Sequence, residues 1–292
     1  MPVLAAIDCS WHDDAALRVA AQIAQRGRQP LTVLTVCRSR EDPVAVSFDE
    51  IMDRIGGMGL PAIPDVQTRV RVGHPATEIV REAEEGAYAL VIVGERPNRS
   101  MMARFLTGST AIRVVEHAPC PVIVAKGKVA PIERILLCDS GSDDSSVAAP
   151  CGANSGGRVV PSVLRRFTGL PLDLHNGDGE IVVLHVMSQM SAGPGVRGKQ
   201  LRSDSDDLIH EHAPEGELLE RDIEALRGMG LRASAKVCHG LVVEEILDEA
   251  QHGDYDLVVI GAYRGAGWQR ILLDDLAHRI VVELDRPVLV VR

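Results

Sequence analysis

Short apolar runs alternate along the chain with longer segments in which apolar residues recur at helical spacing. Apolar runs without a polar residue at every second position are typical of strands buried on both faces of a parallel sheet. Such strands are predicted at 3–7, 31–36, 66–72 (which alternates weakly), 89–93, 122–125, 135–138, 180–186, 232–237, 257–260 and 288–291. Helices are predicted at 13–26, 48–58, 75–85, 110–117, 242–251 and 276–283. Strands that alternate with helices predict the α/β class, built from parallel βαβ units.

The two halves of the chain carry related sequences. Residues 73–94 read GHPATEIVREAEEGAYALVIVG, and residues 240–261 read GLVVEEILDEAQHGDYDLVVIG, which align without a gap. A repeat of this kind predicts two copies of one structural unit. We therefore expect two tandem doubly wound parallel-sheet domains, each with a core of five strands. Their bounds are expected at 1–127 and 132–292, with insertions in the second at about 140–179 and 188–216.

Composition and charge exclude several classes of function. The hydrophobic content of 46% is enough for a core in each half, whereas aromatic residues make up only 3%, too few for base-stacking platforms. The net charge of −10 argues against nucleic acid and anionic membranes as partners. The six cysteines form no CxxC pair, and neither a signal peptide nor an apolar run of membrane-spanning length is present. These features predict a cytoplasmic protein without a zinc site.

The segment after the fourth predicted strand has the properties of a phosphate-binding loop. Gly94 ends that strand, and ligands of doubly wound sheets bind at the carboxyl ends of the strands. Gly108, Ser109 and Thr110 begin the next helix, where free amides and the helix dipole favour an anion. Between them, Asn98 tolerates left-handed backbone angles, and Arg99 adds a cation.

This loop resembles the nucleotide loop of the universal stress protein family, which runs Gly-x-x-Gly, nine residues, then Gly-Ser/Thr. Gly94, Gly108 and Ser109 match, Asn98 replaces the second glycine, and Pro97 is one inserted residue that removes an amide donor. The resemblance covers nearly the whole chain as two tandem copies. It includes an Asp after strand one (Asp8, Asp139) and a Thr/His-Val pair ending strand two (Thr35-Val36, His185-Val186).

The resemblance implies that the first half binds ATP, possibly with Mg²⁺. By analogy with ATP-binding members, Asp8 would contact the nucleoside, and Val36 would contact the base through its main chain. The phosphates would be held by Gly94, Asn98, Gly108, Ser109 and Thr110, with Arg99 nearby. Two alternatives stay open. Asp8 and Ser109 could serve only as helix caps, and the loop could be retained without binding a nucleotide.

In the second half the corresponding loop has lost its phosphate-binding ending. The spacing from Gly261 to Asp274 equals the family spacing, but Gly-Ser has become Asp274-Asp275. A carboxylate close to a phosphate costs roughly 1 kcal/mol in water and about 4 kcal/mol at an effective dielectric constant of about 20. An Asp can still cap the helix predicted to follow. We therefore expect one competent site, in the first half; only a bridging Mg²⁺ could reverse the sign of the field at Asp274.

The leading hypothesis is a non-enzymatic, stress-associated ATP-binding protein. No general base or arginine finger can be assigned, the GxxxxGK[ST] motif is absent, and the sequence 210–212 (HEH) lacks further metal ligands. The alternatives are a scaffold protein that does not bind nucleotide and an adenylating or phosphate-cleaving enzyme. The fifth strands, 122–125 and 288–291, would be aggregation-prone as open edges, and family domains commonly pair through them. We expect that pairing within one chain, and a homodimer is possible.

Overall fold

The computed structural model describes residues 2–7, 15–39, 47–60, 63, 65–95, 110–127, 129–139, 167, 179–187, 214–261 and 268–291. These residues form two compact units. The first unit contains the described residues up to Ile132 together with those after Gly261, and the second contains those from Glu133 to Gly261. The end of the second sequence repeat is therefore part of the same compact unit as the first repeat.

The first unit is built on a sheet in the order β3-β2-β1-β4-β5-β10. Its strands are β1 (Val3–Ile7), β2 (Leu31–Cys37), β3 (Val66–Val72), β4 (Leu90–Gly94), β5 (Val122–Ala125) and β10 (Val288–Val291). The strands β1 to β5 are parallel. β1, β5 and β10 are buried over their whole length, because they are apolar on both faces.

The fifth strands of the two repeats pair with each other. β10 is antiparallel to β5, with Val288 opposite Val124, Leu289 opposite Ile123 and Val290 opposite Val122. This confirms the pairing expected from the apolar character of both strands. β10 covers the edge that β5 would otherwise leave open, and an uncovered apolar edge strand is a template for aggregation.

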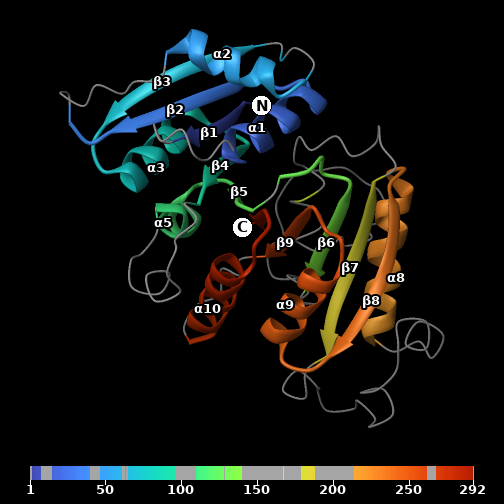
Figure 1. The fold of residues 1–292 in the computed structure, drawn as a ribbon. Helices are drawn as coiled ribbons and strands as arrows, with labels where there is room; N and C mark the ends of the chain where they lie inside the picture. Colours follow the sequence, from blue (N-terminus) through green and yellow to red (C-terminus); the bar gives the residue numbers. More distant parts are fainter. Residues whose placement is uncertain are drawn as a thin grey trace, which may run out of the picture. The chain divides into compact units, whose positions relative to one another are not determined.

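Helices cover both faces of the first sheet. α1 (Ala15–Arg26) and α2 (Phe48–Gly57) lie on one face, and α3 (Pro75–Gly86) and α5 (Thr110–His117) lie on the other (Figure 1). α1 is rich in alanine, and Ala16, Ala20 and Ala24 are almost fully buried against the strands. The core is therefore aliphatic, as the low aromatic content predicts, and the small side chains of α1 allow this helix to pack close to the sheet. α10 (Trp268–Glu283) leads into β10.

The second unit repeats this plan with four parallel strands in the order β9-β6-β7-β8. They are β6 (Arg134–Asp139), β7 (Glu180–Met187), β8 (Arg232–His239) and β9 (Leu257–Gly261). α8 (Pro214–Gly228) and α9 (Val242–His252) lie on opposite faces (Figure 1). The α/β class with doubly wound parallel sheets is thereby confirmed.

Two elements differ from the sequence prediction. The helix α8 was not predicted, although Leu219, Ile223 and Leu226 follow a helical spacing and are buried. α10 begins at Trp268 and not at 276, so Asp274 and Asp275 lie inside this helix. The expectation that Asp274 caps the helix is therefore wrong. The inserted regions 140–179 and 188–216 lie almost entirely outside the described residues.

Candidate functional site

The candidate site lies at the carboxyl ends of the parallel strands in the first unit. β1 is flanked by β2 on one side and by β4 on the other, so the order of the strands reverses at β1. Such a switch point is where doubly wound sheets bind ligands. Val36 is the next-to-last residue of β2, one residue beyond the last described pair of β1 and β2, Ile7 with Thr35. Val36 is therefore placed at the predicted edge of the sheet.

Gly94 is the last residue of β4, where it lies opposite Ala125 of β5 and is exposed. Thr110 is the first residue of α5 and is half-buried. The amino end of a helix favours an anion, and α5 begins at Thr110. The buried residues Ala111, Ile112, Val114 and Val115 fix α5 against the sheet.

The structure thus places Val36 near the end of β2, Gly94 at the end of β4 and Thr110 at the start of α5. Asp8, Asn98, Arg99, Gly108 and Ser109 lie outside the described residues. Within the described part of the chain, no group of His, Cys, Asp and Glu side chains could hold a metal ion.

Sequence reasoning missed a buried ion pair beside Gly94. Glu95 follows Gly94, and its amide donates to the carbonyl of Ala125 at 3.1 Å. Its carboxylate lies 3.0 Å from Nζ of Lys126, the residue that follows β5. The Lys126 side chain is only 8% exposed. The available signal was a lysine placed directly behind an entirely apolar strand.

The strand registers of the two units can be compared at β1 and β6. Val3 of β1 pairs with Leu90, and Ile135 of β6 pairs with Leu257. Ile7 and Asp139 each lie four positions further along and therefore occupy corresponding positions in the two strands. Asp8, the residue that the sequence motif equates with Asp139, lies outside the described residues, so this equivalence stays a prediction. The residue at the end of β7 that corresponds to Thr35 is His185, as predicted.

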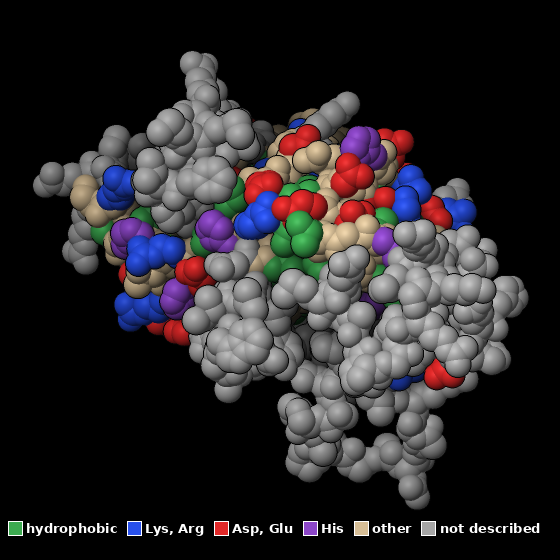
Figure 2. Space-filling model, turned by 90° about the horizontal axis from the view of Figure 1, so that it is seen from below, with side chains coloured by type: hydrophobic (Ala, Val, Ile, Leu, Met, Phe, Trp, Pro, Cys, Tyr) green, Lys and Arg blue, Asp and Glu red, His purple; other side chains and the backbone are tan. Residues whose placement is uncertain are grey.

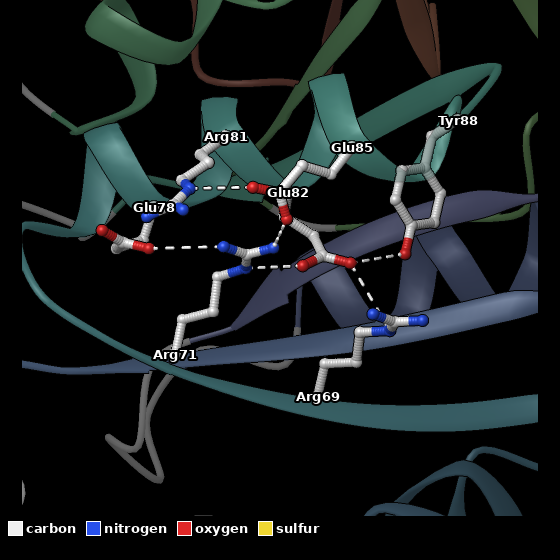
Figure 3. Close-up of polar contacts among 7 residues, drawn as sticks. All are labelled: Arg69, Arg71, Glu78, Arg81, Glu82, Glu85 and Tyr88. Atoms are coloured by element: carbon white, nitrogen blue, oxygen red, sulfur yellow. Dashed lines mark hydrogen bonds and ion pairs between the residues drawn. The ribbon is translucent and has the colours of Figure 1, made fainter.

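A network of charged side chains joins α3 to the edge strand β3 in the first unit (Figure 3). Arg71 lies at its centre and contacts Glu78, Glu82 and Glu85. Its Nε atom is 2.6 Å from Oε2 of Glu82, and the hydrogen bond to Glu85 raises the pKa of Arg71 above its ordinary value. The same bond lowers the pKa of Glu85. Each charge in this network is compensated, so we interpret the network as structural.

Glu82 is buried and also accepts a hydrogen bond of 2.9 Å from the hydroxyl of Tyr88. The second unit repeats this pair, since Tyr255 donates to Oε1 of Glu249 at 2.7 Å. In place of arginine, Lys236 lies 2.6 Å from Oε2 of Glu249. The identical Tyr and Glu positions of the repeat therefore carry the same buried contact in both units.

A polar cavity of about 390 Å³ adjoins Tyr255 in the second unit. Arg134 and Glu180, the first residues of β6 and β7, line it and form an ion pair at 3.3 Å, and the Arg134 guanidinium stacks over the Tyr255 ring at 5.0 Å. The cavity lies at the amino ends of these strands, away from the edge at which such sheets bind ligands. Its basic side chains, Arg134 and Lys236, already pair with carboxylates.

The described surface carries mixed charges. Figure 2 shows Asp and Glu side chains interspersed with Lys and Arg side chains on one face, consistent with the net charge of −10. Among the side chains drawn in colour there, none gather into an extended basic surface of the kind that nucleic acid requires. No helix of the described part of the chain is both long and apolar enough to cross a membrane.

Comparison with known proteins agrees with this geometry. The sequence model of the universal stress protein family matches the chain twice, at residues 1–126 and 131–292. A protein of Staphylococcus aureus (strain USA300) named as a universal stress protein is 26% identical over 144 residues, which cover 45% of this chain and 87% of that protein.

Two solved structures share the fold of the whole chain. A functionally unknown protein from Pseudomonas aeruginosa PAO1 has a TM-score of 0.66 at 19% identity, and the match covers 99% of this chain and 92% of that one. A universal stress protein from Archaeoglobus fulgidus DSM 4304 has a TM-score of 0.59 at 15% identity, covering 100% and 96%.

Proposed function

The chain belongs to the universal stress protein family, and on this premise we propose that it binds an adenine nucleotide, ATP, at the carboxyl ends of β1 and β4 in the first unit. The observation that carries the proposal is the position of Gly94. It is exposed at the end of a central parallel strand, next to the switch point, and the amino end of α5 follows at Thr110. A flexible, anionic polyphosphate fits such an edge.

In this proposal the adenosine lies near the ends of β1 and β2, with Asp8 contacting the nucleoside and Val36 the base. The phosphates extend toward the loop, where Gly94, the residues 98–99 and 108–109, and Thr110 hold them. Mg²⁺, where present, would bind through the phosphates. The charges near Gly94 are compatible with this ligand, because the adjacent carboxylate of Glu95 is neutralised by Lys126.

One observation supports a single nucleotide site. Asp274 and Asp275 lie well inside α10, so their amides belong to the hydrogen-bonded part of the helix and are not free at its amino end. In this proposal the second half therefore lacks the free amides that the first half offers to a nucleotide.

The nucleotide is proposed as a regulatory ligand and not as a substrate. The sequence provides no assignable general base and no arginine finger, so hydrolysis would be slow. The protein would then act in the cytoplasm by presenting a surface that depends on bound ATP.

The decisive experiment is to identify by chromatography what is released on heating the purified chain, and then to titrate MgATP by calorimetry. The variant Gly108→Asp places a carboxylate at the phosphates, and Gly56→Asp is the matched control, because a Cβ at Gly56 meets nothing within 4 Å. Binding to the wild type and to Gly56→Asp, but not to Gly108→Asp, supports the proposal. No binding to the wild type would indicate a scaffold protein, and rapid turnover would indicate an enzyme.

A further inference from the structure

Lys126 connects the candidate site to the C-terminal helix of the chain. Its Nζ atom pairs with Glu95, the residue next to Gly94, and also donates to the carbonyl of Val281. Val281 lies in the last turn of α10, where carbonyls have no partner within the helix. A lysine at this place satisfies one of them and interacts favourably with the negative end of the helix.

A second contact holds the same two segments together. Gly127 follows Lys126 and has a φ of +66°, and a Cβ at this position would lie 1.7 Å from the carbonyl oxygen of Asp285. The backbone after β5 therefore passes directly against the backbone between α10 and β10. We call residues 276–291 the C-terminal segment. Its docking, through this contact and through the pairing of β5 and β10, fixes the position of Lys126.

The charge of Lys126 matters for a phosphate ligand. Glu95 directly follows Gly94 in the sequence, and an uncompensated carboxylate there would repel a polyphosphate. The Nζ atom of Lys126 lies 3.0 Å from Oε2 of Glu95, the lysine side chain is almost fully buried, and its positive charge compensates the carboxylate. An ammonium released from its carbonyl partner and exposed to water would cancel it less well, because water screens the pair.

We propose that Lys126 is a positioning residue that links phosphate binding beside Gly94 to the docking of the C-terminal segment. Docking holds Lys126 against Glu95, and the neutralised Glu95 permits the phosphate to bind. By reciprocity, bound nucleotide stabilises the docked segment. The second repeat thus acts on the site of the first through its last helix and strand. This inference rests on the nucleotide binding proposed above.

The test is a double-mutant cycle on the full chain, with MgATP affinity measured by calorimetry. Lys126→Met leaves Glu95 charged, and we expect affinity to fall about tenfold. Glu95→Gln removes the repelling charge and should leave affinity within about twofold of the wild type. In the double variant, Lys126→Met should cost no more than about twofold relative to Glu95→Gln. A purely structural role of Lys126 would weaken binding equally in both backgrounds, which would overturn the proposal.

Hydrogen exchange provides the second measurement and does not require Lys126→Met to fold. MgATP should slow amide exchange of residues 280–291 in the wild type and in Arg279→Gln, which removes an ion pair with Glu283 on α10 but leaves Lys126 intact. In Glu95→Gln, MgATP should bind without this slowing. Nucleotide that binds the wild type but leaves the exchange of residues 280–291 unchanged would overturn the linkage alone. Absence of nucleotide binding by the wild type would overturn the proposed function and the linkage together.

Discussion

Replacing Gly127 by alanine should strongly destabilise the first unit. Gly127 has a φ of +66°, and an alanine pays about 1–2 kcal/mol for this left-handed conformation. The added methyl group would also lie 1.7 Å from the carbonyl oxygen of Asp285, well inside contact distance. Relieving an overlap in a packed region costs typically about 1–3 kcal/mol. We therefore expect a total loss of about 2–5 kcal/mol in the free energy of unfolding.

The matched control is Gly59→Ala. Gly59 has almost the same φ, +68°, but a Cβ there meets nothing within 4 Å. Its substitution should cost only the conformational part, about 1–2 kcal/mol. Gly56→Ala, inside α2 and equally open, should stabilise by about 0.5–1 kcal/mol.

All three variants lie in the first unit, so urea unfolding followed by circular dichroism compares them directly in one transition. The difference between Gly127→Ala and Gly59→Ala isolates the contact with Asp285, because the left-handed cost is common to both. Equal losses for these two variants would show that the backbone contact between the segment after β5 and the C-terminal segment is absent in solution.

Two further predictions concern side chains. Tyr255→Phe should lower the free energy of unfolding by about 1.5–3 kcal/mol, and by about 1 kcal/mol more than Tyr88→Phe, because Oε1 of Glu82 also faces Arg69 whereas Oε1 of Glu249 is held by Tyr255. Burial raises the pKa of Glu249, but the hydrogen bonds from Lys236 and Tyr255 outweigh it and hold this pKa below its ordinary 4.5. In urea unfolding, the cost of Tyr255→Phe should therefore persist above pH 4.5 and shrink as the pH falls further. Cys120 should react slowly with iodoacetamide at pH 8, because burial raises the pKa of its thiol to about 11; labelling as fast as a free cysteine would contradict this environment.

The regular elements were predictable from sequence wherever local pattern and burial agree. The strands Val3–Ile7, Val122–Ala125 and Val288–Val291 begin and end as predicted, since each is an apolar run flanked by polar residues or proline. The start of α10 was not predictable in this way. The family pattern favoured a loop ending at Asp274, whereas the segment from Trp268 onward continues as helix.

The candidate site likewise contains residues that a local sequence pattern predicts and residues that it does not. Gly94 and Thr110 lie where the pattern of strand, loop and helix predicts them. The pair of Glu95 and Lys126 could not be read from a local pattern, because it joins the ends of two strands, β4 and β5, that become neighbours only when the sheet forms.

The presence of a second repeat has a physical explanation in the first unit. β5 is buried over its whole length and would be an exposed apolar edge without β10. α10 and β10 supply that edge and also the carbonyl that holds Lys126 beside Glu95. These contacts require the last helix and strand of the second repeat, and none of them involves Asp274 or Asp275.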